Sequence, residues 1–292
     1  MNKVLLLLLI VPLYTIQNLF CKIYSNRYEG DSVSASWIYL VFCGALNATV
    51  GLIAVGGTFS PQPLTVLLAC VNAVALVGYY FCMVNASVCG PYSIQMVALL
   101  SGGILIPIFA SAFFGDAISI WKWISIILIL VAIFMSSVKK DDQKIQRKIF
   151  FVLCLGLFIS NGAYSSLLDV QQRLTGESEQ KAMLIMTYGL TAIGAFFVEL
   201  HRKKKDFRKG FQQKKLTMMF MIIGGVAEIA AVNLFVSIIP FVNTALLYSV
   251  NNAGVLLLSV TSSCVLFREK LSVTNWIGCI IMCLGLVGVC VF

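Results

Sequence analysis

The chain has 292 residues, of which 60% are hydrophobic and only 11% are charged, whereas charged residues make up about a quarter of a soluble domain. Between Ser32 and Gly115 there is no charged side chain, so this segment could not form the surface of a soluble protein. The formal net charge of +9 would suggest a nucleic-acid partner in a soluble chain, but the cations stand in short runs between apolar stretches, as in membrane-protein loops. The composition predicts an all-α membrane protein in a lipid bilayer, with no nucleic-acid partner.

A bilayer core of about 30 Å requires about 20 apolar residues per helix. Helix-breaking residues, among them Gly56, Gly90, Pro91 and Pro240, divide the apolar sequence into segments of that length. The first segment follows Lys3 as in a signal peptide, but it lacks a small-residue cleavage site and is expected to remain as a helix. The ten predicted transmembrane helices cover residues 4–21, 34–56, 64–84, 91–114, 118–138, 149–168, 182–200, 216–239, 241–267 and 272–292.

The sequence also contains an internal repeat. Residues 114–120 (FGDAISI) align with residues 267–273 (FREKLSV), 153 positions later. The same offset places Trp276-Ile277 on an earlier Trp-Ile pair. Each half, 1–140 and 141–292, would contain five helices and cross the membrane an odd number of times. The two halves are therefore predicted to be inverted repeats, the architecture of alternating-access carriers.

The positive charges predict the orientation. Of the 21 Lys and Arg residues, all but Lys3, Lys122, Arg173 and Lys181 lie at the loops after the first, third, fifth, seventh and ninth predicted helices. The positive-inside rule places those loops in the cytoplasm and both termini outside. Because no retention signal is present, the plasma (cell) membrane is the expected location.

Several short motifs are similar to those of the drug/metabolite transporter superfamily, specifically the EamA-type ten-helix carriers. The resemblance covers nearly the whole chain and depends on the duplicated acidic turn, on the entry to the fourth helix and on matching pairs in helices one and six. These motifs are Gly115-Asp116 and Arg268-Glu269, Gly90-Pro91, and Tyr14-Thr15 with Tyr164-Ser165. The resemblance to this family implies that the helices surround a central cavity, with helices five and ten at the periphery. Relatives carry amino acids, drugs, nucleotide-sugars and other metabolites, and many keep their termini in the cytoplasm, unlike the orientation predicted here.

Glu228 is the one ionisable side chain near the middle of a predicted span. A carboxylate inside a membrane is costly and usually functional. We expect it to face the cavity and to bind a proton or a cationic group of the substrate. The alternative is a protonated Glu228 bonded to a neighbouring helix, which the small residues Gly224 and Gly225 would allow to approach.

Polar residues gather in two equivalent helices. Tyr248, Asn251 and Asn252 share a helix face, and Asn243 precedes them. The 153-residue offset relates Tyr248 to Gln95, which has Ser101 nearby. These side chains are expected to bind substrate, although Asn and Gln also join membrane helices to one another.

Further candidates come from the other helices. Those expected to bind substrate most directly are Asn18, Asn161, Tyr164 and Tyr79, and the remaining polar candidates are Gln17, Asn47 and Asn72. Asp116 and Glu269 are instead expected to cap the helix that follows each of them.

No enzymatic motif is recognisable, and the single His201 gives no metal site. The sequence thus predicts neither catalysis nor a cofactor. The main hypothesis is a secondary active transporter, an exporter of a small metabolite such as an amino acid or related organic solute, working as a monomer or homodimer by alternating access with proton coupling at Glu228. The alternative is a non-transporting membrane scaffold or assembly subunit. A channel is disfavoured because no ring of like charges is visible.

Overall fold

The computed structural model describes residues 3–56, 59–115, 119–137, 144–176, 179–203, 207–238, 244–269 and 273–291. Within these ranges the chain forms helices and short connections, without a β-strand. The helices are α1 (Lys3–Arg27), α2 (Ser32–Val55), α3 (Pro63–Cys89), α4 (Tyr92–Ala112), α5 (Ile120–Ser137), α6 (Lys144–Thr175), α7 (Gln180–Arg202), α8 (Phe207–Phe211), α9 (Lys215–Ile238), α10 (Thr244–Leu266) and α11 (Val273–Val291).

The all-helical class predicted from the sequence is confirmed, and six of the helices are long and apolar enough to cross a membrane, namely α2, α3, α4, α6, α7 and α9. These features indicate a multi-pass membrane protein. The short α8 was not predicted, and α6 extends beyond its predicted range at both ends. The added turns of α6 contain Lys144, Arg147, Asp169 and Arg173. A search based on apolar residues ends at such polar turns even where the helix continues.

Local sequence sets several helix ends. The Asp31 side chain accepts a hydrogen bond from the backbone N–H of Ser34 (2.6 Å) and so caps the start of α2. Gly56 ends the same helix in the left-handed region, with φ of 66°, where glycine has no steric cost. Pro63 opens α3, since its missing N–H would be unpaired in a first turn anyway.

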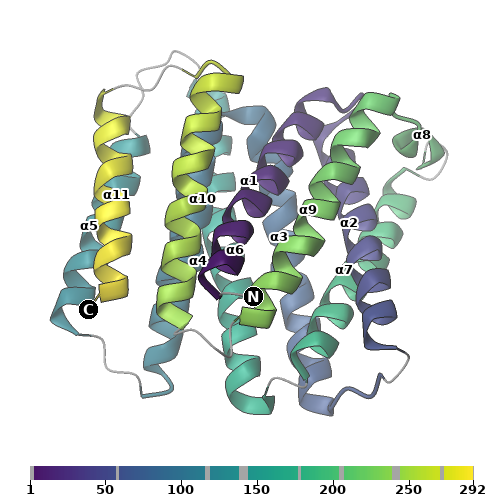
Figure 1. Cartoon of the computed structure of the whole chain (residues 1–292). Coiled ribbons are helices and arrows are strands. Elements are labelled where there is room, and N and C mark those ends of the chain that lie inside the picture. Colours follow the sequence, from purple (N-terminus) through teal and green to yellow (C-terminus); the bar gives the residue numbers. More distant parts are fainter. Residues whose placement is uncertain are drawn as a thin grey trace.

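The helices form one bundle in which neighbours are often far apart in sequence (Figure 1). The main pairs are α1 with α9, α3 with α6, α2 with α7 and α5 with α11, while α4 packs against both α6 and α10. The α5–α11 pair lies at one edge of the bundle and reaches the rest through α4 and α10. We call the end of the bundle where α1 begins and α6 ends the terminus end, and the end where α1 and α7 end and α9 begins the network end.

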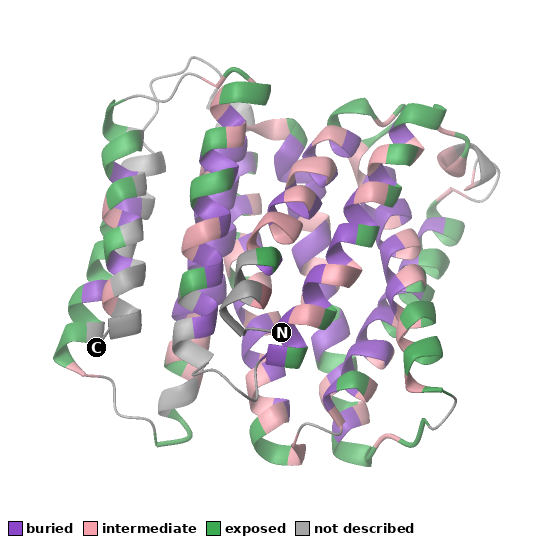
Figure 2. Cartoon of the chain, viewed as in Figure 1, coloured by how far each residue is buried: buried purple, intermediate pink, exposed green. Residues whose placement is uncertain are grey.

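Burial is distributed as in a protein surrounded by lipid. The outer faces carry large exposed apolar side chains, for example Val74, Phe151, Phe197 and Ile280 (Figure 2). The interior contains many buried polar groups, including Asn72. Water would favour the opposite arrangement, whereas a bilayer covers an apolar exterior without cost.

Glycines allow some helices to pack very closely. A Cβ atom added at Gly102 of α4 would lie 2.0 Å from the carbonyl oxygen of Phe158 in α6, and one at Gly162 would lie 2.6 Å from the carbonyl oxygen of Gly102. Small residues at such contacts are typical of packed membrane helices. The α4–α6 contact therefore depends on the absence of a side chain at Gly102.

Gly102→Ala is expected to lower the free energy of unfolding by about 1–3 kcal/mol, because the new methyl group collides with backbone that cannot give way. Gly194→Ala in α7 is the matched control, since a Cβ there meets nothing within 4 Å and alanine favours the helix by up to about 1 kcal/mol. Thermal unfolding in the same detergent compares the two variants. Equal midpoints would show that the α4–α6 contact is not tight.

Glu269 makes a contact that the sequence did not predict. Its carboxylate accepts hydrogen bonds from the backbone N–H groups of Tyr92 (2.6 Å) and Ser93 (3.2 Å) and from the Ser93 hydroxyl (3.0 Å). It therefore caps α4, from the other half of the sequence, while residues 270–272, which lead into the helix that follows it, lie outside the described residues. The end of α10 lies beside the start of α4, where the free N–H groups attract the carboxylate. Asp116, its predicted counterpart, lies outside the described residues.

Candidate functional site

A cavity lies inside the bundle between α1, α3, α4, α6, α7, α9 and α10. It leaves about 80 Å³ for the centres of water-sized molecules, which is room for on the order of five waters. It is thus large enough for a small solute. The polar residues that line it are Tyr14, Gln17, Asn18, Tyr79, Asn161, Tyr164, Ser165, Tyr188, Glu228, Tyr248, Asn251 and Asn252.

The cavity brings together most of the residues singled out in the sequence. Of the residues expected to bind substrate most directly, all but Gln95 line it; they are Glu228, Asn251, Asn252, Tyr248, Asn18, Asn161, Tyr164 and Tyr79. Gln95 is fully buried near the network end, where its amide nitrogen donates to the carbonyl oxygen of Met83 (2.7 Å) and to the hydroxyl of Ser87 (3.1 Å). It joins α3 to α4 and does not face the cavity.

The other sequence candidates divide in the same way. Gln17 lines the cavity. The Asn47 amide donates to the carbonyl oxygen of Cys43 in its own helix (2.9 Å). The Ser101 hydroxyl likewise donates to the carbonyl oxygen of Val97 in its own helix (2.6 Å). Asn72 is buried outside the cavity lining. Asn243 lies outside the described residues.

Glu228 projects into the cavity from α9 with only 2% of its surface exposed. The Tyr188 hydroxyl donates a hydrogen bond to its Oε1 (2.9 Å), and the Tyr164 hydroxyl lies 3.4 Å from that of Tyr188. The second oxygen, Oε2, has no hydrogen-bond partner in the part of the chain that is described. Tyr80 and Cys43 also lie near the carboxylate. Oε2 is therefore a buried acceptor without a hydrogen bond among the described groups.

Tyr188 was missed by the sequence analysis although it is the direct partner of Glu228. Tyrosines in membrane proteins usually lie at the interfaces, and the sequence analysis gave no weight to this one. Its position eight residues into α7, away from both helix ends, was the available signal. A tyrosine at that depth needs a polar partner.

α1 contributes two amides to the cavity. The Gln17 amide nitrogen donates to the Tyr80 hydroxyl (3.0 Å), and the Tyr79 hydroxyl donates to Oδ1 of Asn18 (3.4 Å). Oε1 of Gln17 has no hydrogen-bond partner among the described groups. These contacts hold both amides against α3 while leaving one acceptor unused.

α6 and α10 contribute further polar groups to the cavity lining. The Asn161 amide donates to the carbonyl oxygen of Leu99 (2.8 Å), and the Asn251 amide donates to Oδ1 of Asn252 (3.3 Å). The Tyr248 hydroxyl donates to the carbonyl oxygen of Ser165 (3.4 Å). Oδ1 of Asn251 is again unpartnered as far as the structure describes its surroundings.

The cavity extends from the middle of the bundle towards the terminus end. Its lining residues come from the last halves of α6 and α9 and from the first halves of α7 and α10, which all lie on that side. The α1 and α3 residues come from the middle of their helices. The network end therefore lies outside the part of the bundle that the cavity occupies.

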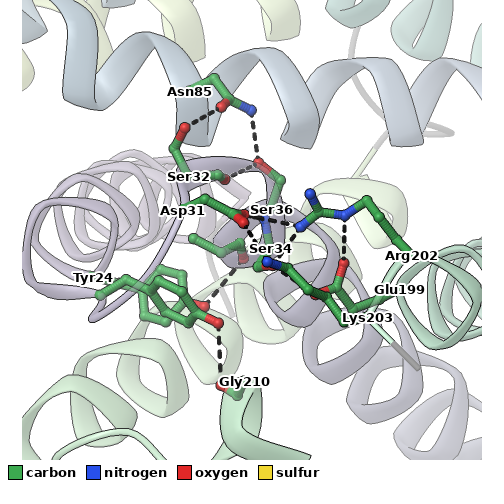
Figure 3. A network of polar contacts seen from close by, with 12 residues as sticks. Tyr24, Asp31, Ser32, Ser34, Ser36, Asn85, Glu199, Arg202, Lys203 and Gly210 are labelled. Atoms are coloured by element: carbon green, nitrogen blue, oxygen red, sulfur yellow. Dashed lines mark hydrogen bonds and ion pairs between the residues drawn. The ribbon is translucent and has the colours of Figure 1, made fainter. Parts of the chain in front are cut away.

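At the network end, a cluster of charged and hydroxyl side chains joins α2 to α7 (Figure 3). Arg202 pairs with Asp31 (2.9 Å) and with Glu199 (3.0 Å) and also donates to the Ser34 hydroxyl, which donates to Glu199 (2.6 Å). Lys203 pairs with the other oxygen of Asp31 (2.9 Å). Burial raises the pKa of Asp31, but hydrogen bonds from Lys203, Ser34 and Arg202 outweigh it and hold that pKa well below its usual value. Asp31 is thus ionised at neutral pH.

A second contact at the network end involves Lys22 of α1. Its ammonium group donates to the carbonyl oxygen of Gly90 (2.9 Å), where α3 meets α4, and lies 5.5 Å from the centre of the Phe267 ring. Glu269, which caps α4, interacts electrostatically with it. The Arg202 cluster and the Lys22 contact together connect the first half of the chain to the second half.

Arg202→Ala is expected to lower the free energy of unfolding by about 1–3 kcal/mol. Glu199 is only 2% exposed, and without Arg202, which is 33% exposed, it would keep a buried charge with a hydroxyl partner alone. Lys214→Ala is the control, because its pair with Glu29 is exposed and should contribute roughly 0–1 kcal/mol. Thermal unfolding in detergent measures both. An Arg202 effect no larger than the Lys214 effect would show that the cluster does not hold this end.

Comparisons with known proteins bear on the fold. No protein-family description matches the chain, and no curated protein matches it. A solved structure described only as "Crystal structure of protein" aligns with 98% of this chain and with 96% of its own chain. The TM-score is 0.59 and the sequence identity is 13%. The chain therefore shares over nearly its whole length a fold already seen in a solved structure.

Proposed function

We propose that this protein is a secondary active transporter that exports a small metabolite, such as an amino acid or related organic solute, by alternating access with proton coupling at Glu228. The observation that carries the proposal is the cavity in the middle of the bundle, lined by a buried carboxylate that has one oxygen without a hydrogen bond among the described groups. A scaffold has no need for such a costly group in a hollow interior.

Ten membrane spans are part of the proposal. Besides the six strongly apolar helices, α1, α5, α10 and α11 have 25, 18, 23 and 19 residues. A helix rises about 1.5 Å per residue, so each of them is about as long as a bilayer core of about 30 Å. The short α8 lies outside this set.

The helix pairs support an inverted repeat. In such a repeat, α1, α2, α3, α4 and α5 would correspond to α6, α7, α9, α10 and α11. Replacing each helix by its counterpart in the other half then converts the α1–α9 pair into the α6–α3 pair. The same exchange leaves the α2–α7, α4–α10 and α5–α11 pairs unchanged. All of these pairs are present, as expected for two similar halves packed about a two-fold axis.

The proposed orientation puts the network end in the cytoplasm of a cell whose plasma membrane contains the protein. In the sequence, the connections at that end and the helix turns next to them contain 17 of the 21 Lys and Arg residues. The termini and the cavity would then lie towards the outside. In this arrangement the described conformation is closed on the cytoplasmic side by the Arg202 cluster and the Lys22 contact, and both contacts would have to break for the cavity to open inwards.

A ligand screen tests the proposal. Purified protein is heated with amino acids, nucleosides, sugars and organic cations at two pH values, and any compound that raises the unfolding temperature is then tested for movement into liposomes. A transporter should yield a compound that both stabilises the protein and crosses the membrane. If the folded protein neither binds nor moves any of them, the scaffold alternative is favoured.

A further inference from the structure

Three buried oxygens of the described lining residues have no hydrogen-bond partner, and all three are acceptors. They are Oε2 of Glu228, Oε1 of Gln17 and Oδ1 of Asn251, on residues that are 2%, 3% and 5% exposed. An unpaired buried acceptor costs roughly 1–3 kcal/mol, so a ligand that donates hydrogen bonds to these atoms would recover that cost. Glu228 adds a negative charge when it is ionised. A ligand with N–H donors and a positive charge fits this set.

Several donors of the cavity, by contrast, are already used. The Asn161, Gln17 and Asn251 amide nitrogens donate to protein oxygens, and so do the hydroxyls of Tyr79, Tyr188 and Tyr248. None of the described lining residues is Lys, Arg or His. A carboxylate or phosphate group would therefore find no cation and would be repelled by an ionised Glu228.

Aromatic rings complete the surroundings of Glu228. Tyr14, Tyr164, Tyr188 and Tyr248 line the cavity with Phe235, whose ring centre is 4.9 Å from that of Tyr248 and 6.1 Å from that of Tyr14. The faces of aromatic rings attract cations when water is excluded. The walls thus favour the same charge as Glu228.

We infer that the substrate is a small organic amine in its protonated form, without a carboxylate group, held by Glu228, Gln17 and Asn251. This inference rests on the proposed transport function and narrows it, since it selects amines over the amino acids from which they differ by one carboxylate. It also selects protonated amines over quaternary ammonium ions, which have no N–H groups for the unpaired acceptors.

Matched pairs of compounds test the inference. Putrescine is compared with ornithine, phenethylamine with phenylalanine, and each amine with tetramethylammonium, by thermal stabilisation of the purified protein and by uptake into liposomes. At least one amine should bind at least tenfold more tightly than its amino acid and than tetramethylammonium. In Glu228→Gln the preference for amine over amino acid should shrink at least tenfold, because the charge is lost while the amide keeps the shape.

The outcomes separate this inference from the proposed function. If an amino acid binds as tightly as its amine and is transported, the substrate class is wrong and the transport function stands. An unchanged preference in Glu228→Gln would likewise overturn the assignment of the amine to this carboxylate. If neither member of any pair binds or moves and the wider screen is also negative, the transport function fails and the inference fails with it.

Discussion

Glu228→Gln is expected to abolish accumulation of solute driven by a pH gradient while leaving the protein folded. Glutamine has nearly the shape of glutamate and can still accept the hydrogen bond from Tyr188, but it cannot take up and release a proton. Transport should then fall at least tenfold in the presence of the gradient. The measurement is uptake of the solute identified in the ligand screen into proteoliposomes with and without an imposed pH difference.

The control for this variant is Asn233→Ala on the same helix. Asn233 is exposed and its amide donates to the carbonyl oxygen of Ile229 in α9 itself, so its loss should leave transport nearly unchanged. If Glu228→Gln accumulates solute as well as the Asn233 variant, Glu228 does not couple transport to protons.

Ser165→Trp is expected to eliminate solute binding by filling the cavity. Ser165 lies in the wall of the cavity next to Tyr164, and only about 80 Å³ is open to the centres of water-sized molecules. An indole ring in that space would displace any solute. Binding, followed by thermal stabilisation or by calorimetry with the ligand, should become undetectable, a loss of at least a hundredfold.

Ile159→Trp provides the comparison, since this side chain is exposed on the outer face of the same helix α6. A tryptophan is well tolerated in contact with lipid, so this variant should bind the solute normally. If Ser165→Trp is folded and binds like Ile159→Trp, the solute site lies elsewhere.

The helices and the most unusual residue of the site could be predicted from the sequence. Apolar segments about as long as a bilayer is thick fix where helices lie, and Glu228 was recognisable because a carboxylate in a membrane span is rare. The helix ends were less predictable, since the polar turns of α6 continue the helix beyond the apolar segment.

The position of Gln95 outside the cavity has a physical reason. The internal repeat relates Gln95 to Tyr248, and each lies in the first turns of its helix, α4 or α10. These two helices begin at opposite ends of the bundle, and the cavity is displaced towards the terminus end, where α10 begins. Tyr248 therefore lines the cavity while Gln95 packs between α3 and α4. A repeat in the sequence does not reveal such a displacement.

The polar cluster at the network end was also not predictable. Arg202 and Lys203 entered the sequence analysis only as cations that set the orientation, because their partner Asp31 is distant in sequence. The same holds for Glu269, whose contact with α4 joins residues 177 positions apart. Contacts of this kind depend on the packing of helices, which composition and periodicity do not specify.

Counterflow in proteoliposomes tests alternating access most directly. Vesicles are loaded with an unlabelled solute that the protein binds and are diluted into a trace of the labelled compound, with no ion gradient. A carrier that exposes one site alternately to the two sides should concentrate the label transiently inside, and Ser165→Trp should not. Simple equilibration of the label would indicate a channel, and no movement through a folded, ligand-binding protein would contradict transport altogether.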